Sequence, residues 1–210
     1  MIRILLVDDH PVVRHGIRQI LSDGLHGVQI DEASDAMGAL AKIRATPWDI
    51  VVLDITLPGV SGLDLLKDLR PEFPSLPVLV LSVHPASQFA RRVLAAGASG
   101  YLSKESAATE LIHAIETIRR GKPYLGGREG QAVWSAKGAT NRAPHDLLSD
   151  REYQVLRMLG SGRTASEIAV DLGLSVKTIS TYRARVLEKL QMHSNAELMR
   201  YAIENKLLDS

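Results

Sequence analysis

Short aliphatic runs alternate with helix-like segments over the first 120 or so residues. Five runs have the length and composition of buried strands, at residues 2–7, 28–30, 50–53, 77–81 and 101–102. Between them, apolar residues recur at helical spacing, as in Val13, Ile17 and Leu21. Near-continuous aliphatic strands that alternate with helices indicate a parallel sheet covered on both faces. We therefore predict an α/β fold with a doubly wound, five-stranded parallel sheet.

The pattern breaks between Gly121 and Pro144, where glycines are frequent and aliphatic residues are few. This composition predicts a linker over residues 121–146, in which a short helix is expected around residues 131–134. Beyond it, a hydroxyl residue is followed three positions later by Glu at three helix starts, Ser149/Glu152, Thr164/Glu167 and Ser194/Glu197. With a helix beginning at Ser175, four helices are expected. The chain is thus divided into an α/β domain, residues 1–120, and a small all-α domain, residues 147–210.

Composition narrows the class of protein. The chain has 210 residues, enough for two domains, and a formal net charge of +1, so any basic surface for nucleic acid must be local. Cysteine is absent, which excludes disulfides and thiolate metal sites and fits a reducing cytosol. No apolar run approaches the length of a membrane span or of a signal-peptide core. A cytoplasmic protein without a membrane partner is expected.

Polar side chains gather at the carboxyl ends of the predicted strands. Asp8 and Asp9 follow the first strand, Asp54 ends the third, Ser82 ends the fourth and Lys104 follows the fifth. Ligands of doubly wound sheets bind at this edge. Three converging carboxylates resist ionisation unless a cation lies among them. Mg²⁺ suits oxygen ligands and can bridge to a phosphoryl oxygen, so the pattern fits phosphoryl transfer onto a carboxylate.

Each of these residues also has an ordinary explanation. An Asp pair after a strand is often a solvated loop or a helix cap, Lys104 could be a surface charge and Tyr101 a half-buried strand residue. The coincidence of five polar positions at one sheet edge favours the phosphoacceptor interpretation. His10 and His84 border this region and are interpreted as solvated neighbours rather than ligands.

The first 120 residues closely resemble the receiver domains of two-component response regulators, which have a flavodoxin-like fold. The motifs are VDDHP at 7–11, VLDITLPGVSG at 52–62, VLVLS at 78–82 and GYLSK at 100–104. The resemblance implies that Asp54 accepts a phosphoryl group. It also implies that Asp9, Asp54 and the backbone carbonyl of Thr56 bind Mg²⁺, with Asp8 acting through a metal-bound water.

The same resemblance implies a switch near the phosphoryl group. Lys104 would pair with the phosphoryl oxygens, Ser82 would donate its hydroxyl to them, and Tyr101 would change position as Ser82 moves. Pro58 and Gly62 would shape the loop after the phosphoacceptor. Many receivers have proline directly after the lysine, whereas this sequence has Glu105.

Residues 164–171, the Leu-Gly-Leu turn at 172–174 and residues 175–190 have the spacing of a helix-turn-helix. Projection of the second helix at 3.6 residues per turn places four residues toward the core: Ile179, Val186, Leu187 and Leu190. The residues expected to contact DNA are Lys177, Thr178, Ser180, Thr181, Arg183, Ala184, Arg185 and Lys189. Lysine and arginine can meet phosphates or guanine edges, and the small Ala184 permits close approach to bases.

This region resembles the LuxR-type helix-turn-helix of the NarL/FixJ class. The matching segments are LSDREYQVLRMLGSG at 148–162, ASEIAVDLGLSVKTISTYRARVLEKL at 165–190 and NAELMRYAI at 195–203. Ser180 and Tyr182 stand where the family often has lysine and histidine, and Glu188 adds a carboxylate. The aromatic content of 4% disfavours a reader of single strands, which stacks bases on aromatic rings, so duplex DNA is expected.

These expectations together describe a phosphorylation-dependent transcription regulator of a two-component system. Its expected partners are a sensor histidine kinase, double-stranded promoter DNA and a second copy of the chain after phosphorylation. No enzyme activity is expected beyond the receiver's own phosphoryl transfer and dephosphorylation. One alternative is a constitutive or ligand-controlled DNA binder with an inactive receiver. Another is a metal-dependent hydrolase that uses the same carboxylates. The sequence indicates neither a second general acid nor a substrate pocket for such an enzyme.

Overall fold

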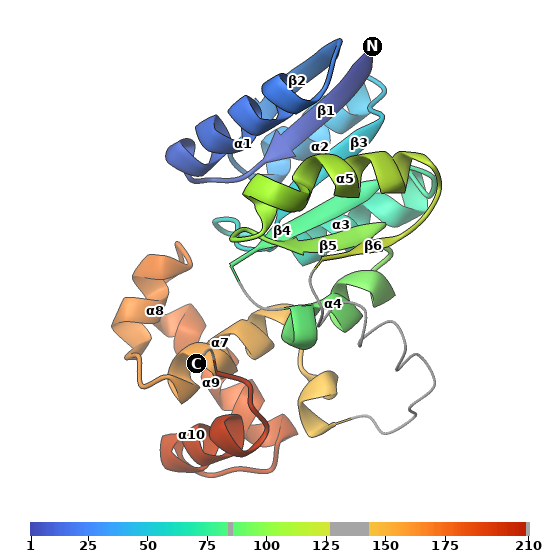
Figure 1. Cartoon of the computed structure of the whole chain (residues 1–210). Helices are drawn as coiled ribbons and strands as arrows, with labels where there is room; N and C mark the ends of the chain where they lie inside the picture. The colour runs from blue at the N-terminus through green and yellow to red at the C-terminus, as the bar shows by residue number, and fades with distance from the viewer. Residues whose placement is uncertain (84–85, 127–142, 209–210) are drawn as a thin grey trace. The chain divides into compact units, whose positions relative to one another are not determined.

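The computed structural model describes residues 1–83, 86–126 and 143–208 of the chain (Figure 1). It comprises two compact units, Met1–Gly138 and Ala139–Ser210. The division falls inside the predicted linker. The short helix expected around residues 131–134 lies outside the described residues.

The first unit is built on a parallel sheet with the strand order β2-β1-β3-β4-β5-β6. Its strands are β1 (Ile2–Val7), β2 (Val28–Ala33), β3 (Ile50–Asp54), β4 (Val78–Ser82), β5 (Gly100–Ser103) and β6 (Tyr124–Leu125). The first five strands confirm the predicted doubly wound sheet. Since β1 lies between β2 and β3, the chain reverses its direction of travel across the sheet at β1. Ligand sites of such sheets lie beside this reversal, at the carboxyl ends of the strands.

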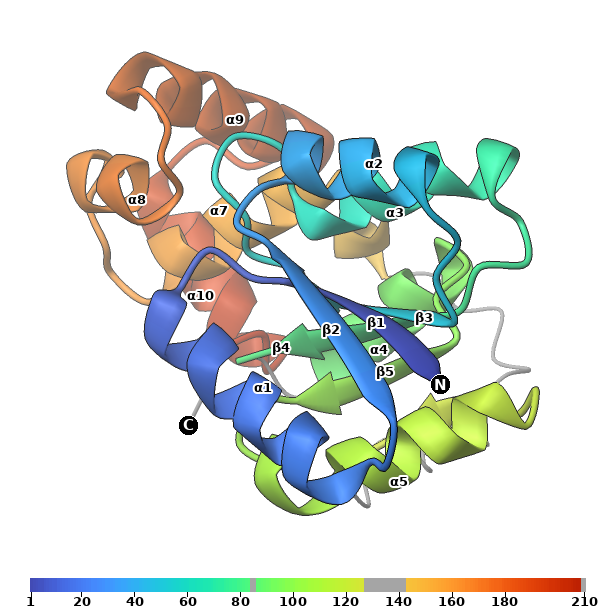
Figure 2. The ribbon, with the colours of Figure 1, turned by 90° about the horizontal axis from the view of Figure 1, so that it is seen from above.

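Helices cover both faces of the sheet, as Figure 2 shows. α1 (Pro11–Gly24) and α5 (Ala107–Arg119) lie on one face, and α2 (Ala36–Ala45) and α3 (Gly62–Glu72) lie on the other. α4 (Ala86–Ala95) packs against β5. The core beneath α1 and α5 consists of fully buried aliphatic residues, among them Ile4, Leu6, Leu21, Val52, Leu79, Leu102, Leu111 and Ile115. Burial on both faces explains why the strand sequences are aliphatic without polar alternation.

The prediction of five strands was wrong by one, because β6 adds a sixth strand inside the segment expected to be linker. Tyr124 N donates to Ser99 O (3.1 Å) and Gly126 N donates to Tyr101 O (2.9 Å). A Cβ at Gly100 would lie only 2.7 Å from Tyr124 O, so glycine permits this close approach. A strand of two residues beside several glycines gives almost no periodic signal, which is why the sequence pattern did not indicate it.

The second unit is helical and confirms the four predicted helices. It contains a 3₁₀ turn (Pro144–Leu147), α7 (Asp150–Gly160), α8 (Ala165–Asp171), α9 (Val176–Lys189) and α10 (Asn195–Glu204). Complete capping boxes begin α7 and α8. At α10 the hydroxyl of Ser194 caps Glu197 N, but Glu197 Oε2 accepts from His193 N instead of closing the box.

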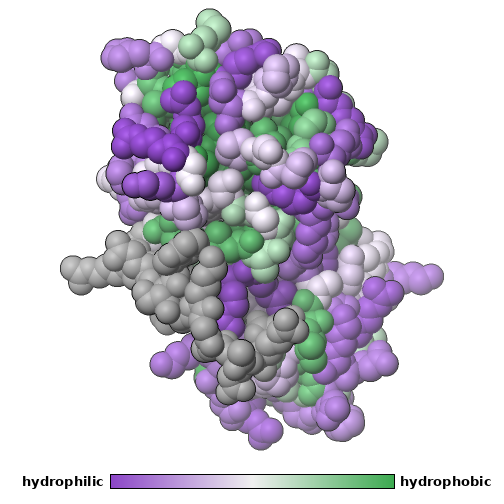
Figure 3. Space-filling model, turned by 90° about the vertical axis from the view of Figure 1, so that its right-hand side faces the viewer, coloured by the Kyte–Doolittle hydropathy of each residue, from purple (hydrophilic) through white to green (hydrophobic). Residues whose placement is uncertain are grey.

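No helix in the described ranges is long and apolar enough to cross a membrane. Hydrophilic residues cover most of the face drawn in Figure 3, and patches of hydrophobic residues lie between them.

Candidate functional site

The acidic residues meet at the sheet edge where β1 and β3 end. Asp8 and Asp9 directly follow β1, and Asp54 is the last residue of the neighbouring strand β3. One ligand atom from each of Asp8, Asp9, His10 and Asp54 lies within 4.8 Å of the others. Asp8 and Asp54 are almost fully buried, at 1% and 3% exposure. The sheet therefore brings together the three carboxylates that the sequence predicted to converge.

Lys104 joins two of these carboxylates. Its Nζ donates to Asp8 Oδ2 and to Asp54 Oδ2, both at 2.7 Å. Burial opposes the charged form of Lys104, but the carboxylates of Asp54 and Asp8 outweigh burial and raise its pKa. One ammonium thus compensates part of the negative charge of the pocket.

Burial dominates the protonation of Asp54. Removal from water raises the pKa of Asp54 to about 6, although Lys104 and the backbone N–H of Thr56 stabilise the ionised form. Thr56 N lies 3.1 Å from Asp54 Oδ1. At neutral pH the carboxylate is mostly ionised, which is the form that can act as a nucleophile.

The pocket fits a hard divalent cation by its oxygen donors and by one buried carboxylate oxygen that accepts no hydrogen bond from the described residues. Asp9 Oδ1 is buried, and no hydrogen-bond partner for it lies in the part of the chain that the structure describes. His10 Nδ1 lies 2.7 Å from this oxygen and forms an ion pair with it when the imidazole is protonated. Carboxylate and carbonyl oxygens are the donors that Mg²⁺ prefers. Asp9 therefore keeps an acceptor available for a metal ion.

The predicted switch residues lie on the next two strands. Ser82 ends β4 and is fully buried, and its carbonyl accepts from Lys104 N at 2.7 Å. Ser82 is aligned with Ser103 of β5, directly before Lys104. Tyr101 is also fully buried. The main chain therefore couples Ser82 to Lys104. His84 lies outside the described residues, and Glu105 is exposed.

The loop after Asp54 depends on Gly62, as predicted. The backbone N–H of Gly62 donates to Ile55 O at 2.9 Å. A Cβ at Gly62 would collide with the backbone oxygen of Asp54 and would lie 2.9 Å from its carbonyl carbon. Only glycine lets α3 begin this close to the end of β3.

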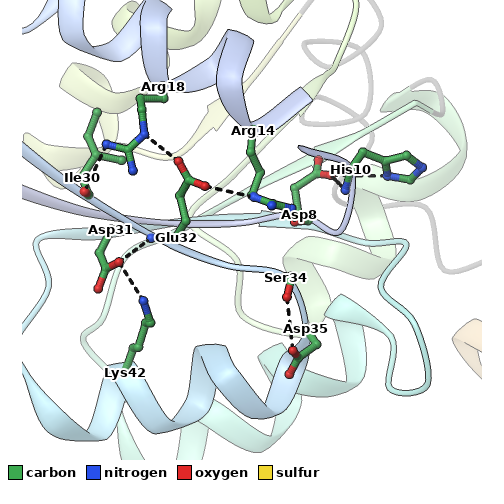
Figure 4. A network of polar contacts seen from close by, with 10 residues as sticks. All are labelled: Asp8, His10, Arg14, Arg18, Ile30, Asp31, Glu32, Ser34, Asp35 and Lys42. Carbon is green, nitrogen blue, oxygen red and sulfur yellow. Dashed lines mark hydrogen bonds and ion pairs between the residues drawn. The ribbon is translucent and has the colours of Figure 1, made fainter. Parts of the chain in front are cut away.

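Two contacts on Asp8 were not predicted from the sequence. Arg14 Nη1 donates to Asp8 O at 2.6 Å, and His10 N donates to Asp8 Oδ1 at 2.7 Å (Figure 4). Arg14 is one of several charged residues on an amphipathic helix, so its spacing alone carries no signal. Its closeness to the Asp pair was the one available hint.

In the second unit, α8 and α9 form the predicted helix-turn-helix. Gly173 in the turn has a φ of 62°, a conformation that glycine adopts without steric cost. α9 begins at the capping residue Ser175, whose Oγ accepts from Thr178 N at 3.0 Å. Ile179 and Val186 are fully buried, as projected. The helix thus presents the opposite face outward.

The outward face of α9 carries most of the predicted DNA-contacting side chains. The exposed residues of this set are Lys177, Ser180, Thr181, Ala184, Arg185 and Lys189, and the half-buried ones are Thr178 and Arg183. The hydroxyls of Ser180 and Thr181 donate to backbone carbonyls one turn earlier, at 2.9 and 3.0 Å. In this state their oxygens serve only as acceptors toward a ligand.

Two of the predicted DNA-contacting cations have partners within the unit. Arg183 Nε donates to Asn195 Oδ1 at 2.6 Å, and Lys189 Nζ donates to Glu152 Oε2 at 2.6 Å. Both contacts tie α9 to other helices, so these cations are partly engaged. Lys177 and Arg185 are exposed and make no such contact with the described residues.

Comparison with known proteins gives two domain matches. A family model for the response regulator receiver domain matches residues 4–116. A second model, for bacterial regulatory proteins of the luxR family, matches residues 146–202. The chain belongs to the response regulators.

Relatives of this response regulator match it over its whole length. It is 36% identical over 213 residues to the response regulator UvrY of Escherichia coli O6:H1, covering 100% of this chain and 97% of UvrY. It is also 36% identical over 213 residues to the response regulator GacA of Pseudomonas viridiflava, covering 100% of this chain and 99% of GacA.

Solved structures of response regulators are also similar to this chain. RcsB from Salmonella enterica serovar Typhimurium, bound to promoter rprA in the presence of the phosphomimetic BeF3⁻, matches this response regulator with a TM-score of 0.65 and 27% identity. The match covers 96% of this chain and 98% of RcsB. A LuxR-family two-component response regulator from Aurantimonas sp. SI85-9A1 matches with a TM-score of 0.60 and 38% identity, over 65% of this chain and 98% of that one.

Proposed function

We propose that a sensor histidine kinase phosphorylates Asp54 and that this modification controls binding of double-stranded promoter DNA through α9. The observation that supports it most is the buried Asp54 carboxylate, held 2.7 Å from Lys104 Nζ beside Asp8 and Asp9. This arrangement combines a nucleophile, a fixed cation and a set of oxygen donors for a metal ion. The regulator acts in the cytoplasm, where DNA and the kinase domain are both accessible.

The phosphoryl transfer needs few protein groups. A carboxylate oxygen of Asp54 attacks the phosphorus of phosphohistidine. The P–N bond breaks as the P–O bond forms, and the leaving imidazole takes a proton from solvent. Lys104 Nζ stays within reach of the phosphoryl oxygens and offsets their negative charge.

Asp9, Asp54 and the backbone carbonyl of Thr56 would hold Mg²⁺, with Asp8 acting through a water. The bound ion supplies positive charge to the phosphoryl oxygens. The residues of the chain fit this role by donor type and by Asp9 Oδ1, a buried oxygen that accepts no hydrogen bond from the described residues. The same pocket, with water as the attacking group, supports the slow dephosphorylation of Asp54.

Ser82 and Tyr101 transmit the conformational change that follows phosphorylation of Asp54. A phosphoryl group on Asp54 offers new acceptors to the Ser82 hydroxyl and to Lys104, which are already joined through the Ser82 carbonyl. Movement of β4 and β5 then changes the surroundings of Tyr101. The regulator shifts between an inactive and an active conformation. Contacts of the phosphoryl group that favour the active conformation by about 5.5 kcal/mol would change the ratio of active to inactive protein from 1:99 to 99:1.

α9 reads duplex DNA in the major groove. Lys177, Thr181, Ala184 and Arg185 lie exposed on one face, and Ala184 permits close approach of the helix axis. The contacts of Thr178, Ser180, Arg183 and Lys189 lie at the margins of this face. Solved RcsB structures include two dimers bound to DNA. By analogy, the phosphorylated regulator binds as a homodimer to paired half-sites.

The decisive experiment compares Asp54→Asn with wild type. Each protein is treated with acetyl phosphate and Mg²⁺, its phosphorylation is followed by intact mass, and its affinity is measured for a duplex selected from a random pool. Wild type should gain one phosphoryl group and bind more tightly, whereas Asp54→Asn should do neither. Asp49→Asn, directly before β3 at the opposite end from Asp54, is the matched control and should behave as wild type.

Two results would contradict the proposal. If Asp54→Asn kept stimulated DNA binding, Asp54 would not be the phosphoacceptor. If wild type bound DNA equally with and without phosphorylation, the chain would be a DNA binder with an inactive receiver.

A further inference from the structure

We propose that Arg14, held by Glu32, positions the loop after β1 for divalent-cation binding, which makes Arg14 a positioning residue for phosphorylation of Asp54. The inference rests on the proposed function of the acidic pocket. It concerns how the backbone that carries Asp8 and Asp9 is fixed in place.

The backbone of Asp8 leaves the sheet at the pocket. The β1–β2 ladder ends with Val7 aligned to Ala33, and Asp8 N still donates to Ala33 O at 3.1 Å. The carbonyl of Asp8 lies beyond the ladder and accepts from Arg14 Nη1 at 2.6 Å. A hydrogen bond from a charged donor is short and about twice as strong as a neutral one. Arg14 thus replaces the strand partner that this carbonyl lacks.

Glu32 fixes the guanidinium of Arg14. Arg14 Nε donates to Glu32 Oε2 at 3.1 Å, and Arg18 Nε donates to Glu32 Oε1 at 2.6 Å. Arg14 and Arg18 are four residues apart on α1, so both side chains lie on the same face of the helix. The hydrogen bonds from Arg18 and Arg14 hold the pKa of Glu32 below its ordinary value despite partial burial. The carboxylate is therefore charged at neutral pH and orients both guanidinium groups.

The contacts of Glu32 with α1 are separate from a second ion pair, which joins the same strand, β2, to α2. Figure 4 shows Glu32 pointing from β2 toward α1, whereas the preceding Asp31 points toward α2. There Lys42 Nζ donates to Asp31 Oδ1 at 2.7 Å. Successive residues of a strand face opposite sides of the sheet. The Lys42–Asp31 pair is therefore a matched control: it has similar chemistry but does not contact Asp8.

Asp8 is then held at three points: the carbonyl by Arg14, Oδ1 by His10 N and Oδ2 by Lys104. Mg²⁺ requires near-ideal octahedral geometry, so it tolerates little displacement of its ligands. Loss of a residue that orients metal ligands typically weakens metal binding by about 10–100-fold. Release of the Asp8 carbonyl should therefore weaken cation binding without removal of any ligand.

The test measures Mn²⁺ affinity directly, from the free Mn²⁺ signal in electron paramagnetic resonance. The folded proteins compared are wild type, Arg14→Ala, Glu32→Gln, the double variant and Lys42→Ala. Arg14→Ala should raise the Kd about tenfold, and Glu32→Gln should raise it by a smaller factor. The double variant should match Arg14→Ala, because Glu32 acts through Arg14. Lys42→Ala should bind as wild type or slightly more tightly.

The direction of the change separates positioning from simple electrostatics. Removal of a positive charge near a cation site strengthens cation binding if only the field matters, so Arg14→Ala would then lower the Kd. A purely structural Arg14 would lower the free energy of unfolding and leave the Kd of the folded protein unchanged. Either result would overturn the inference.

Two further comparisons keep the test decisive. If Arg14→Ala does not fold, Glu32→Gln and Arg14→Lys replace it, and unchanged Kd values in both would overturn the inference. Phosphorylation of wild type by acetyl phosphate is measured in parallel. Wild type that neither binds Mn²⁺ nor becomes phosphorylated would refute the proposed function itself. Normal phosphorylation of wild type with unchanged variants would refute only the role of Arg14.

Discussion

The acidic pocket of the receiver is assembled from residues far apart in the sequence, whereas the outward face of α9 comes from one stretch of helix. Lys104 contacts carboxylates 96 and 50 residues earlier in the chain, and these carboxylates are almost fully buried. The side chains of Lys177, Thr181 and Arg185 succeed one another within two helical turns or so and are exposed. One site is defined by the backbone of a whole domain, and the other by the helical repeat.

This difference determines what each site tolerates. A pocket built from three strands is disturbed by any change that shifts a strand end, even when the functional groups are intact. An exposed helical face keeps its geometry when a side chain is removed, provided that the buried side of the helix is intact. Substitutions that disturb the backbone or core should therefore change stability. Substitutions that remove an exposed functional group should change binding and leave stability nearly unchanged.

The largest change in stability is expected from Ile179→Ala, on the buried side of α9. Ile179 is fully buried, so truncation should lower the free energy of unfolding of the second unit by about 2–5 kcal/mol. Calorimetry of the full chain measures this in the transition of that unit. Ser180→Ala, at the exposed neighbouring position, should change it by no more than about 0.5 kcal/mol. Equal effects of the two substitutions would refute the assignment of the two faces.

Gly62→Ala should have a smaller effect on stability but a large one on the pocket. The added Cβ collides with the backbone of Asp54, so the loop must shift at a cost of about 1–3 kcal/mol. The rate of Asp54 phosphorylation by acetyl phosphate should fall as well. Gly16→Ala is the control, because a Cβ there meets nothing within 4 Å. Normal phosphorylation of Gly62→Ala would show that the pocket is less dependent on the backbone than inferred.

Asp54→Asn should stabilise the metal-free protein, and the gain should grow with pH. Burial raises the pKa of Asp54 to about 6 from an ordinary 3.8, so ionisation of Asp54 opposes folding and stability is lost as the pH rises from about 4 to about 6. The two-unit shift corresponds to about 3 kcal/mol at pH 7.5 and to about half of that at pH 5. Urea unfolding with EDTA at both pH values measures the gain. A larger gain at pH 5 than at pH 7.5 would contradict this account of Asp54.

Removal of Lys177 or Arg185, two exposed cations of α9, should leave stability nearly unchanged. Lys177→Ala and Arg185→Ala should each alter the free energy of unfolding by less than about 0.5 kcal/mol, since both residues are exposed. Each should weaken DNA binding. Loss of one phosphate contact should also reduce the slope of the logarithm of affinity against the logarithm of salt concentration by about 1. Arg200→Ala, an exposed arginine on α10, is the control. Wild-type affinity in the double variant would exclude α9 as the reader.

The same contrast explains what the sequence could and could not predict. The pocket residues were predictable because each follows an aliphatic strand, and parallel strands end at one edge. The outward face of α9 followed from helical periodicity. Both inferences need only the local pattern and one general rule about folds.

Side-chain contacts between different helices and strands could not be predicted from the sequence. The hydrogen bond from Lys189 to Glu152 depends on how α9 packs against α7, which helical projection does not contain. The hydrogen bond from Arg14 to the Asp8 carbonyl depends on the course of the chain after β1. β6 was missed for another reason, because two residues are too few to show alternation. Its Tyr-Leu pair, followed by two glycines, was the only trace of a strand.

β6 also marks where backbone pairing in the first unit ends. Gly126 is hydrogen-bonded to β5, and the 3₁₀ turn of the second unit begins at Pro144. Whatever path the chain takes, covalent geometry limits the separation of these two residues to about 65 Å. This limit exceeds the spacing of about 34 Å between half-sites one turn of DNA apart. The covalent connection between the units therefore does not by itself dictate the spacing of the operator.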